Sequence, residues 1–553
     1  MVCMTSQAEW WKKAVCYQIY PRSFKDSDAD GIGDLNGIIS KLDYLNDGTE
    51  KSLGIDAIWL NPVYPSPQYD FGYDITDITG IDPQYGSMQD FDRLLEEAHK
   101  RNISILMDFV PSVTSHLNPW FIESRSSRRS PKRDWYLWKD PAPGGRVPNK
   151  WLGMFGGGAW TWDAKTQQYY FHNSLPEQPD LNWRNPEVEK AMLSCMDFWL
   201  KKGVDGFRID VLNFAFKDEL FRDNPACLGR RPYEMQRHIY DRDRPEAVEI
   251  GKKMRSLIDR YPDRTLVAEI FVNDPQEATR YYGERQDGVN LVFNFSFAYA
   301  PFSAERFRAE VERWEHSTEG KGWPSYFLSN HDMARHASRF ARGLQTEARA
   351  RVAAAMLLTL RGTPFLYMGE EIGMLNGKVK RHELMDPVGV RYWPFNPGRD
   401  IARTPVQWNG SDNAGFSDVK PWLPVHPGYP SSNVARQAAQ SDSLLAWYRR
   451  LIWLRKRSDA LSTGAFRSLK DAPAGVFAYT REAEKEKVVV LLNFTPRRKS
   501  FSLLASLEAN GISGSAWSKA KVLLNWPSAD TPEPVDFTHI VLEPYEVEII
   551  SID

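Results

Sequence analysis

An arginine and an aspartate stand two residues apart at the end of an apolar run, Gly206 to Asp210. In an extended strand, residues i and i+2 project from the same face, so we expect Arg208 and Asp210 to lie side by side. The guanidinium would keep the carboxylate ionised and fix its orientation. An oriented, ionised carboxylate is suited to act as a nucleophile.

Two further acids follow apolar runs in the same way. Glu269 ends the run that begins at Thr265, and Asp332 follows the run that begins at Tyr326, directly after His331. A single acid at a strand end is usually a turn or helix cap, but three such ends favour a shared site. Retaining glycosidases need one carboxyl group to attack the anomeric carbon and another to protonate the leaving oxygen. The three acids therefore indicate glycoside chemistry.

Short apolar runs alternate with helical patterns, such as those of residues 88–101 and 186–202, over most of the chain. Eight such alternations predict an α/β fold, the (β/α)8 or TIM barrel, whose active site lies at the carboxyl ends of the strands. The predicted strands are Val15–Tyr20, Ala57–Leu60, Ile103–Asp108, Gly206–Asp210, Leu266–Glu269, Leu291–Phe295, Tyr326–Ser329 and Phe365–Met368.

The chain has 553 residues, too many for one compact core. Residues 109–183 are rich in Pro, Gly, Trp and Asn and too long for a simple loop, so we expect an inserted subdomain after the third strand. Residues 461–553 contain short alternating apolar runs, which predict a C-terminal antiparallel β-sandwich. The barrel would comprise residues 1–108 and 184–460.

The net charge of −2 provides no broad positive field for nucleic acid. No apolar run is long enough to span a bilayer, and no leader pattern stands at the N-terminus. We therefore expect a cytoplasmic protein, a monomer or homodimer, with no membrane or nucleic-acid partner.

The motifs resemble those of the α-amylase family of glycoside hydrolases. Within it, the similar branch contains α-glucosidases, oligo-1,6-glucosidases, α-glucosyl-transferring enzymes and sucrose isomerases. The resemblance covers essentially the whole chain. Its motifs are Trp10–Lys12, Gln18–Phe24, Asp70–Asp74, Gln178–Asn182, Asp205–Asp210, Glu269, Asn330–Asp332, Gly369–Gly373 and Arg403–Trp408.

The resemblance implies catalytic roles. Asp210 would be the nucleophile and Glu269 the general acid/base. Asp332 would hold the 2- and 3-hydroxyls and strain the sugar ring toward the transition state. Arg208 would orient the nucleophile, and His331 would bind a ring hydroxyl.

The resemblance also implies how the glycosyl unit is held. Tyr73 would stack under the ring. Asp70 and Arg403 would bind the 4-hydroxyl at the non-reducing end, closing the pocket and making the enzyme exo-acting. Arg399 is a nearby alternative to the favoured Arg403.

An acidic segment near the N-terminus, 26–34, has aspartates at alternating positions and glycine at the sixth, as at the start of a calcium loop. Alone, the pattern fits an acidic turn equally well. The family has a metal loop at this position, so the resemblance implies a structural Ca²⁺ or Mg²⁺ ion. The expected ligands are Asp26, Asp28, Asp30, the carbonyl of Ile32 and Asp34.

Two positions depart from the family pattern on one wall of the expected pocket. Val113 stands where the family has a histidine that bonds the 6-hydroxyl, and Ser174 stands where it has a phenylalanine. One hypothesis is a glycone that differs at carbon 6, either substituted there or lacking the hydroxymethyl group. The alternative is a locally reshaped wall with ordinary glucose still bound.

The leading hypothesis is a retaining exo-acting α-glucosidase acting on short oligosaccharides or α-glucosides. Val211, directly after the nucleophile, resembles the residue of α-1,6-specific relatives and favours that linkage weakly. A transglucosylase or sucrose isomerase would share every catalytic residue. A non-catalytic sugar-binding relative is disfavoured because the chain keeps all three acids.

Overall fold

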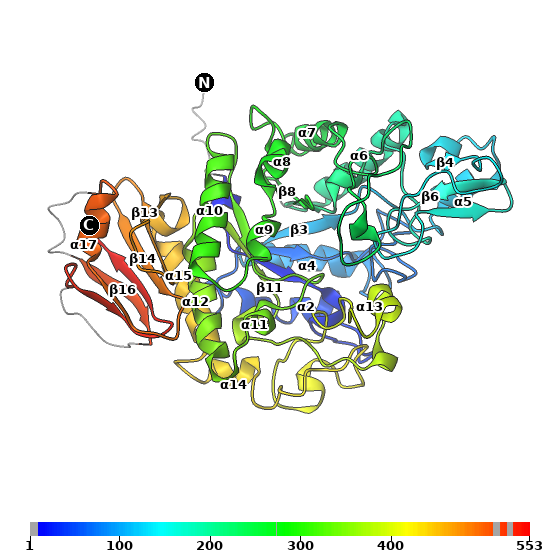
Figure 1. The fold of residues 1–553 in the computed structure, drawn as a ribbon. Coiled ribbons are helices and arrows are strands. Elements are labelled where there is room, and N and C mark those ends of the chain that lie inside the picture. Colours follow the sequence, from blue (N-terminus) through cyan, green and yellow to red (C-terminus); the bar gives the residue numbers. More distant parts are fainter. Residues whose placement is uncertain (1–8, 273, 513–519, 528–534, 553) are drawn as a thin grey trace, which may run out of the picture.

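The structure, a computed structural model, describes residues 9–272, 274–512, 520–527 and 535–552. Its centre is a sheet of eight parallel strands in the order β10-β11-β1-β2-β3-β7-β8-β9 (Figure 1). A bridge between Phe293 and Ser325 joins the two edges and closes the barrel. The strands are β1 Cys16–Ile19, β2 Ala57–Leu60, β3 Ser104–Phe109, β7 Gly206–Ile209, β8 Thr265–Ala268, β9 Leu291–Val292, β10 Ser325–Phe327 and β11 Thr363–Tyr367.

The predicted barrel is confirmed, with small shifts at strand ends. The largest difference is β9, which spans two residues where five were predicted. It stops early because Asn294 caps a short helix, α9 (Phe295–Ala298), by accepting a hydrogen bond from the amide of Phe297 over 2.9 Å.

The barrel interior is filled by alternate residues of its strands. On β2, Trp59 belongs to the interior cluster, whereas its neighbours Ile58 and Leu60 pack outward against the helices. This period of two is what a closed sheet requires. The interior cluster includes Cys16, Ala57, Trp59, Leu106, Val267, Leu291, Phe293, Phe327 and Phe365.

Helices surround the barrel, and local signals set their ends. Helix α6 (Pro186–Lys202) begins after Asn185, whose side chain accepts from the amide of Glu187, and ends at Gly203 with φ 104°. Helix α4 (Met88–Lys100) starts with a capping box between Ser87 and Asp90. The other long helices are α7 Glu246–Ile258, α10 Ala304–Thr318, α12 Thr346–Thr359 and α15 Leu444–Arg457.

Three long connections leave the carboxyl ends of the strands, one of them after β11. Between β3 and α6 lie helix α5 (Pro119–Ser126) and a three-stranded antiparallel sheet. The strands of this sheet are β4 Trp138–Lys139, β5 Trp160–Asp163 and β6 Gln168–Phe171. The second connection, from Val211 to Pro245, contains only short 3₁₀ helices before α7 and was not predicted as a feature.

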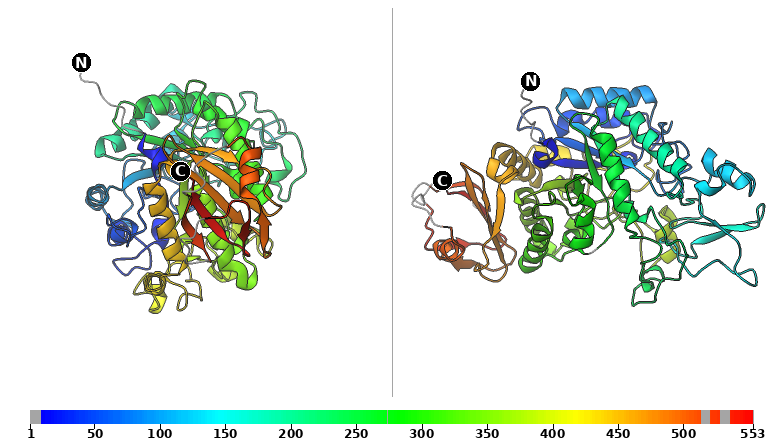
Figure 2. Two further views of the ribbon diagram at one scale, coloured as in Figure 1. Left: turned by 90° about the vertical axis from the view of Figure 1, so that its left-hand side faces the viewer. Right: turned by 90° about the horizontal axis from the view of Figure 1, so that it is seen from above.

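The chain ends in the predicted antiparallel C-terminal module, on the opposite side of the barrel from β4–β6 (Figures 1 and 2). Its five-stranded sheet has the order β12-β13-β14-β18-β16, and β15 pairs with β17 in a second sheet. The strands are β12 Ala465–Ser468, β13 Val476–Glu482, β14 Lys487–Asn493, β15 Lys499–Phe501, β16 Lys521–Trp526, β17 Ile540–Leu542 and β18 Val547–Ser551.

Strand β13 serves two cores at once. Phe477 and Tyr479 join the main core shared with the barrel, whereas Val476 and Ala478 join a separate cluster with helix α17 (Leu503–Ala509). None of the helices in the described part of the chain has the length and hydropathy that crossing a bilayer requires.

Candidate active site

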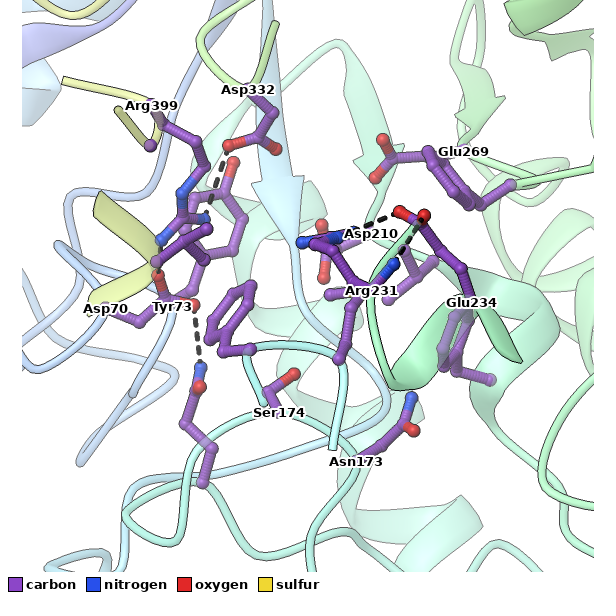
Figure 3. A pocket seen from close by; sticks show the side chains of 18 of the residues that line it. Asp70, Tyr73, Asn173, Ser174, Asp210, Arg231, Glu234, Glu269, Asp332 and Arg399 are labelled. Carbon is purple, nitrogen blue, oxygen red and sulfur yellow. Dashed lines mark hydrogen bonds and ion pairs between the residues drawn. The ribbon is translucent and has the colours of Figure 1, made fainter. Parts of the chain in front are cut away.

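A cavity of about 790 Å³ opens at the carboxyl ends of the barrel strands. Asp210, Glu269 and Asp332 all line it, together with Asp70 and Tyr73 (Figure 3). Asp210 directly follows β7 and Glu269 directly follows β8, while Asp332 lies in the turn after β10. The structure therefore brings together the acids that the sequence placed at three strand ends.

Arg208 joins the two expected catalytic carboxylates. Its fully buried guanidinium donates to Asp210 Oδ1 over 2.7 Å and also contacts Glu269. The same Nη1 donates over 2.7 Å to Asp108, which faces Arg208 in the β3–β7 register. Asp108 was not among the predicted site residues. Its position at the end of a predicted strand is the sequence signal that could have identified it.

Two opposing effects act on the pKa values of Asp210 and Glu269. Burial raises the pKa of Asp210 well above its usual value, and Glu269 and Asp108 raise it further against the effect of Arg208. Burial likewise raises the pKa of Glu269, with Asp332 and Asp108 adding to the rise. Three carboxyl groups thus share one arginine, an arrangement that favours keeping one proton on the pair while the other carboxylate is ionised.

Asp332 is held as a carboxylate. Burial alone would raise its pKa, but the charges of Arg399 and Arg403 lower it below the usual range. Arg403 Nη2 lies 2.7 Å from Asp332 Oδ1 and Arg399 Nη1 lies 3.4 Å from the same oxygen. An ionised carboxylate here can accept hydrogen bonds from two neighbouring sugar hydroxyls.

The predicted pairing of Asp70 with Arg403 was wrong. Asp70 Oδ1 lies 2.7 Å from Arg399 Nη2, not from Arg403, and Gln178 donates to its other oxygen over 3.1 Å. Arg403 instead binds Asp332 and the carbonyl of His331. The cause is an anchor outside the motif, because Asp386 accepts from both the backbone amide and the side chain of Arg399.

Tyr73 and His331 form a stacked pair beside the cavity. Their ring centroids are 5.5 Å apart at an interplanar angle of 6°, and Tyr73 Oη lies 2.8 Å from His331 Nε2. Tyr73 donates to Asp108 over 2.8 Å, and Gln18 Nε2 contacts His331 Nδ1 over 2.8 Å. These partners assign the proton to Nε2. Burial lowers the pKa of His331 well below its usual value, so the imidazole is neutral.

The divergent residues also line the cavity. Val113 and Ser174 lie on one wall, and Val211 lies next to the nucleophile. Val211 has φ 30° and ψ 54°, a left-handed conformation that a β-branched residue rarely adopts. Its carbonyl accepts from the amide of Phe214 over 2.8 Å, so the surrounding turn holds this strained position.

Several cavity residues gave no usable sequence signal. Arg231 and Glu234, an ion pair with 2.8 Å between Nε and Oε1, come from the irregular connection after β7. Phe395 comes from the long segment after β11 and is 95% exposed. Irregular backbone has no period from which a side-chain direction can be predicted.

The acidic N-terminal segment brings three of its predicted ligands together. One carboxylate oxygen each from Asp26, Asp28 and Asp34 lies within 4.8 Å of the others, a donor set that suits a hard cation. Asp30 is not in this group, and its carboxylate accepts from the amide of Ile32 over 2.7 Å.

Comparisons with known proteins agree with this geometry. The family model described as "Alpha amylase, catalytic domain" matches residues 18–464. A probable alpha-glucosidase of Rhizobium meliloti is 41% identical over 521 residues, covering 91% of this chain and 93% of that protein. An oligo-1,6-glucosidase of Heyndrickxia coagulans is also 41% identical, covering 89% of this chain and 93% of that protein.

A solved structure of the α-glucosyl transfer enzyme XgtA superposes with a TM-score of 0.90 at 38% identity, covering 98% of this chain and 99% of that one. These matches and the site define a glycoside hydrolase. The chain belongs to the α-amylase family.

Proposed function

We propose that this chain is a retaining, exo-acting α-glucosidase that cleaves terminal α-linked glucose from short oligosaccharides or α-glucosides. The carrying observation is the pairing of Asp210 and Glu269 on the guanidinium of Arg208 at the wall of one cavity. Asp210 attacks the anomeric carbon, and Glu269 protonates the leaving oxygen and later deprotonates water.

An ion pair on one side of the cavity supports the proposed exo-action. The ion pair of Asp70 and Arg399 stands beside Tyr73, away from Glu269 (Figure 3). It offers a donor and an acceptor to one sugar hydroxyl, here the 4-hydroxyl of the terminal unit. A chain continuing beyond that hydroxyl would meet this pair.

Proton NMR of the first product tests the proposal. Hydrolysis of 4-nitrophenyl α-glucoside, whose only sugar is the glycone, must release α-glucose before mutarotation, because double displacement retains configuration. Initial release of β-glucose, or no glucose at all, would refute it. Faster turnover of maltose than of isomaltose would reject the weak preference for α-1,6 linkages that Val211 suggests.

Glucosyl transfer is the second candidate, and the cavity rim supports it. Phe271 and Tyr299 line the cavity and are 38% and 51% exposed, and Phe395 lines the same cavity. Aromatic faces can bind a sugar or aromatic acceptor and displace the water that would otherwise react. Product analysis with sucrose, and with maltose plus a phenolic acceptor, separates transfer and isomerisation from hydrolysis.

The group of Asp26, Asp28 and Asp34 supports a structural Ca²⁺ or Mg²⁺ ion. Its carboxylates lie in a loop outside the catalytic cavity, so the ion would stabilise the fold and take no part in the reaction.

A further inference from the structure

One wall of the catalytic cavity combines small side chains with a buried amide oxygen that has no partner among the described residues. Val113 and Ser174 line this wall. Asn173 lines it too and is 3% exposed. Within the described part of the chain, its Oδ1 is buried without a hydrogen-bond partner. Buried amide oxygens are usually hydrogen-bonded, so this oxygen is a candidate acceptor for a ligand.

Asp180 fixes this wall. Its backbone bridges to that of Val113, and its carboxylate accepts from the backbone amide of Asn173 over 2.7 Å. The same carboxylate binds Lys217, which also donates to the carbonyl of Phe214. The wall is therefore anchored. Lys217 beside it is already engaged by Asp180, and Arg231, which lines the same cavity, is paired with Glu234.

The proposed binding mode, on which this inference rests, sets which part of the sugar meets the wall. Asp332 binds O2 and O3, Asp70 lies at O4, and Asp210 and Glu269 face C1. In a pyranose, C5 lies across the ring from C2, so its C6 substituent faces away from Asp332. Figure 3 shows Asp332 and Ser174 on opposite sides of the cavity.

We propose that Asn173, Ser174 and Val113 form a recognition site for a neutral substituent on carbon 6, larger than hydroxymethyl and bearing an N–H or O–H. An acylamino group is the chemical class that fits. The hydrogen-bonding requirement comes from the unpartnered amide oxygen of Asn173, which can exchange places with the amide nitrogen by a half-turn of the side chain. The size comes from the short side chains of Val113 and Ser174, and the neutrality from the engaged Lys217.

A panel of three 4-nitrophenyl α-glycosides tests the site: the glucoside, the 6-deoxyglucoside and the 6-acetamido-6-deoxyglucoside. The wild-type protein should turn over the acetamido substrate at least as well as the glucoside, with both about tenfold above the 6-deoxy substrate in kcat/KM. Asn173→Leu should lower kcat/KM for the first two by about 10–100-fold and spare the 6-deoxy substrate. Equal losses on all three would show that Asn173 only supports the fold, overturning the site.

Ser174→Phe is the matched size control. It should lower kcat/KM for the acetamido substrate about tenfold more than for the glucoside, because the larger ring fills the space that the substituent needs. A wild-type preference of tenfold or more for the glucoside over the acetamido substrate would overturn the larger subsite.

Binding to an inactive variant separates failure of this site from failure of the proposed function. Asp210→Asn should bind free 6-acetamido-6-deoxyglucose and glucose more tightly than 6-deoxyglucose in calorimetry, and adding Asn173→Leu should erase the difference. Binding without any turnover by wild-type protein would refute the hydrolase and leave the site standing. No discrimination among the three sugars would refute the site.

Discussion

Asp108 and Arg208 face each other in register on adjacent parallel strands and are joined by a hydrogen bond of 2.7 Å. The same arginine contacts both catalytic carboxylates, so Asp108 is a third negative charge on their shared partner. The strand register therefore determines how the active site titrates.

Asp108→Asn should move the alkaline limb of the pH profile to lower pH. Asp108 raises the pKa of Glu269, and activity is lost as pH rises and the general acid loses its proton. Removing the charge lowers the pKa of Glu269, and the alkaline limb moves with it. The measurement is kcat/KM against pH. Glu548→Gln, a carboxyl replacement in the C-terminal sheet, is the control, and an unchanged limb in Asp108→Asn would contradict the expectation.

Alanine variants of Asp210 and Glu269, assayed with added azide, should distinguish the roles of the two acids. Glu269→Ala should slow substrates with poor leaving groups by about 10²–10⁴-fold, and azide should restore turnover of activated aryl glucosides, giving the α-azide. Asp210→Ala should instead give the β-azide, because azide takes the place of the missing carboxylate and attacks the anomeric carbon in a single displacement. NMR of the products decides, and the opposite pattern would reverse the two assignments.

Arg399→Lys should weaken recognition of the 4-hydroxyl. Its Nη2 contacts Asp70 and Asp386 at 2.7 Å each, a geometry that an ammonium group cannot reproduce. We expect kcat/KM for an aryl α-glucoside to fall about 10–100-fold, with little change for its 4-deoxy analogue.

Arg403→Lys is the matched comparison for this experiment. Arg403 binds Asp332, so its loss should reduce turnover of both substrates alike. If Arg403→Lys alone discriminated between them, the assignment of Asp70 and Arg399 to the 4-hydroxyl would fail.

Chelation should destabilise the protein if Asp26, Asp28 and Asp34 hold a cation. At a Ca²⁺ concentration of about 100 times Kd, binding contributes about 2.7 kcal/mol, so EDTA should lower the Tm by a few degrees. Asp28→Asn should remove most of this difference. Asp30→Asn should keep it, because that carboxylate lies outside the group. Equal EDTA sensitivity in Asp28→Asn and wild type would locate the ion elsewhere.

Regular structure carried most of what the sequence could predict. The period of two on β7 placed Arg208 beside Asp210 correctly, and the strand ends located all three acids. The partner of Asp70 could not be predicted, because Arg399 and Arg403 lie four residues apart in irregular backbone and Asp386 decides between them. Asn173 was missed for a related reason, since only the folded structure shows that its amide oxygen lacks a partner among the described residues.

Strand β13 places neighbouring side chains alternately against the barrel and against the C-terminal cluster. Truncating the chain before this module would expose a broad apolar surface on the barrel. The isolated module would expose the matching apolar surface. We therefore expect the barrel and the C-terminal module to unfold as one cooperative unit. Calorimetry should record a single transition, in which activity and the structure of the module are lost together.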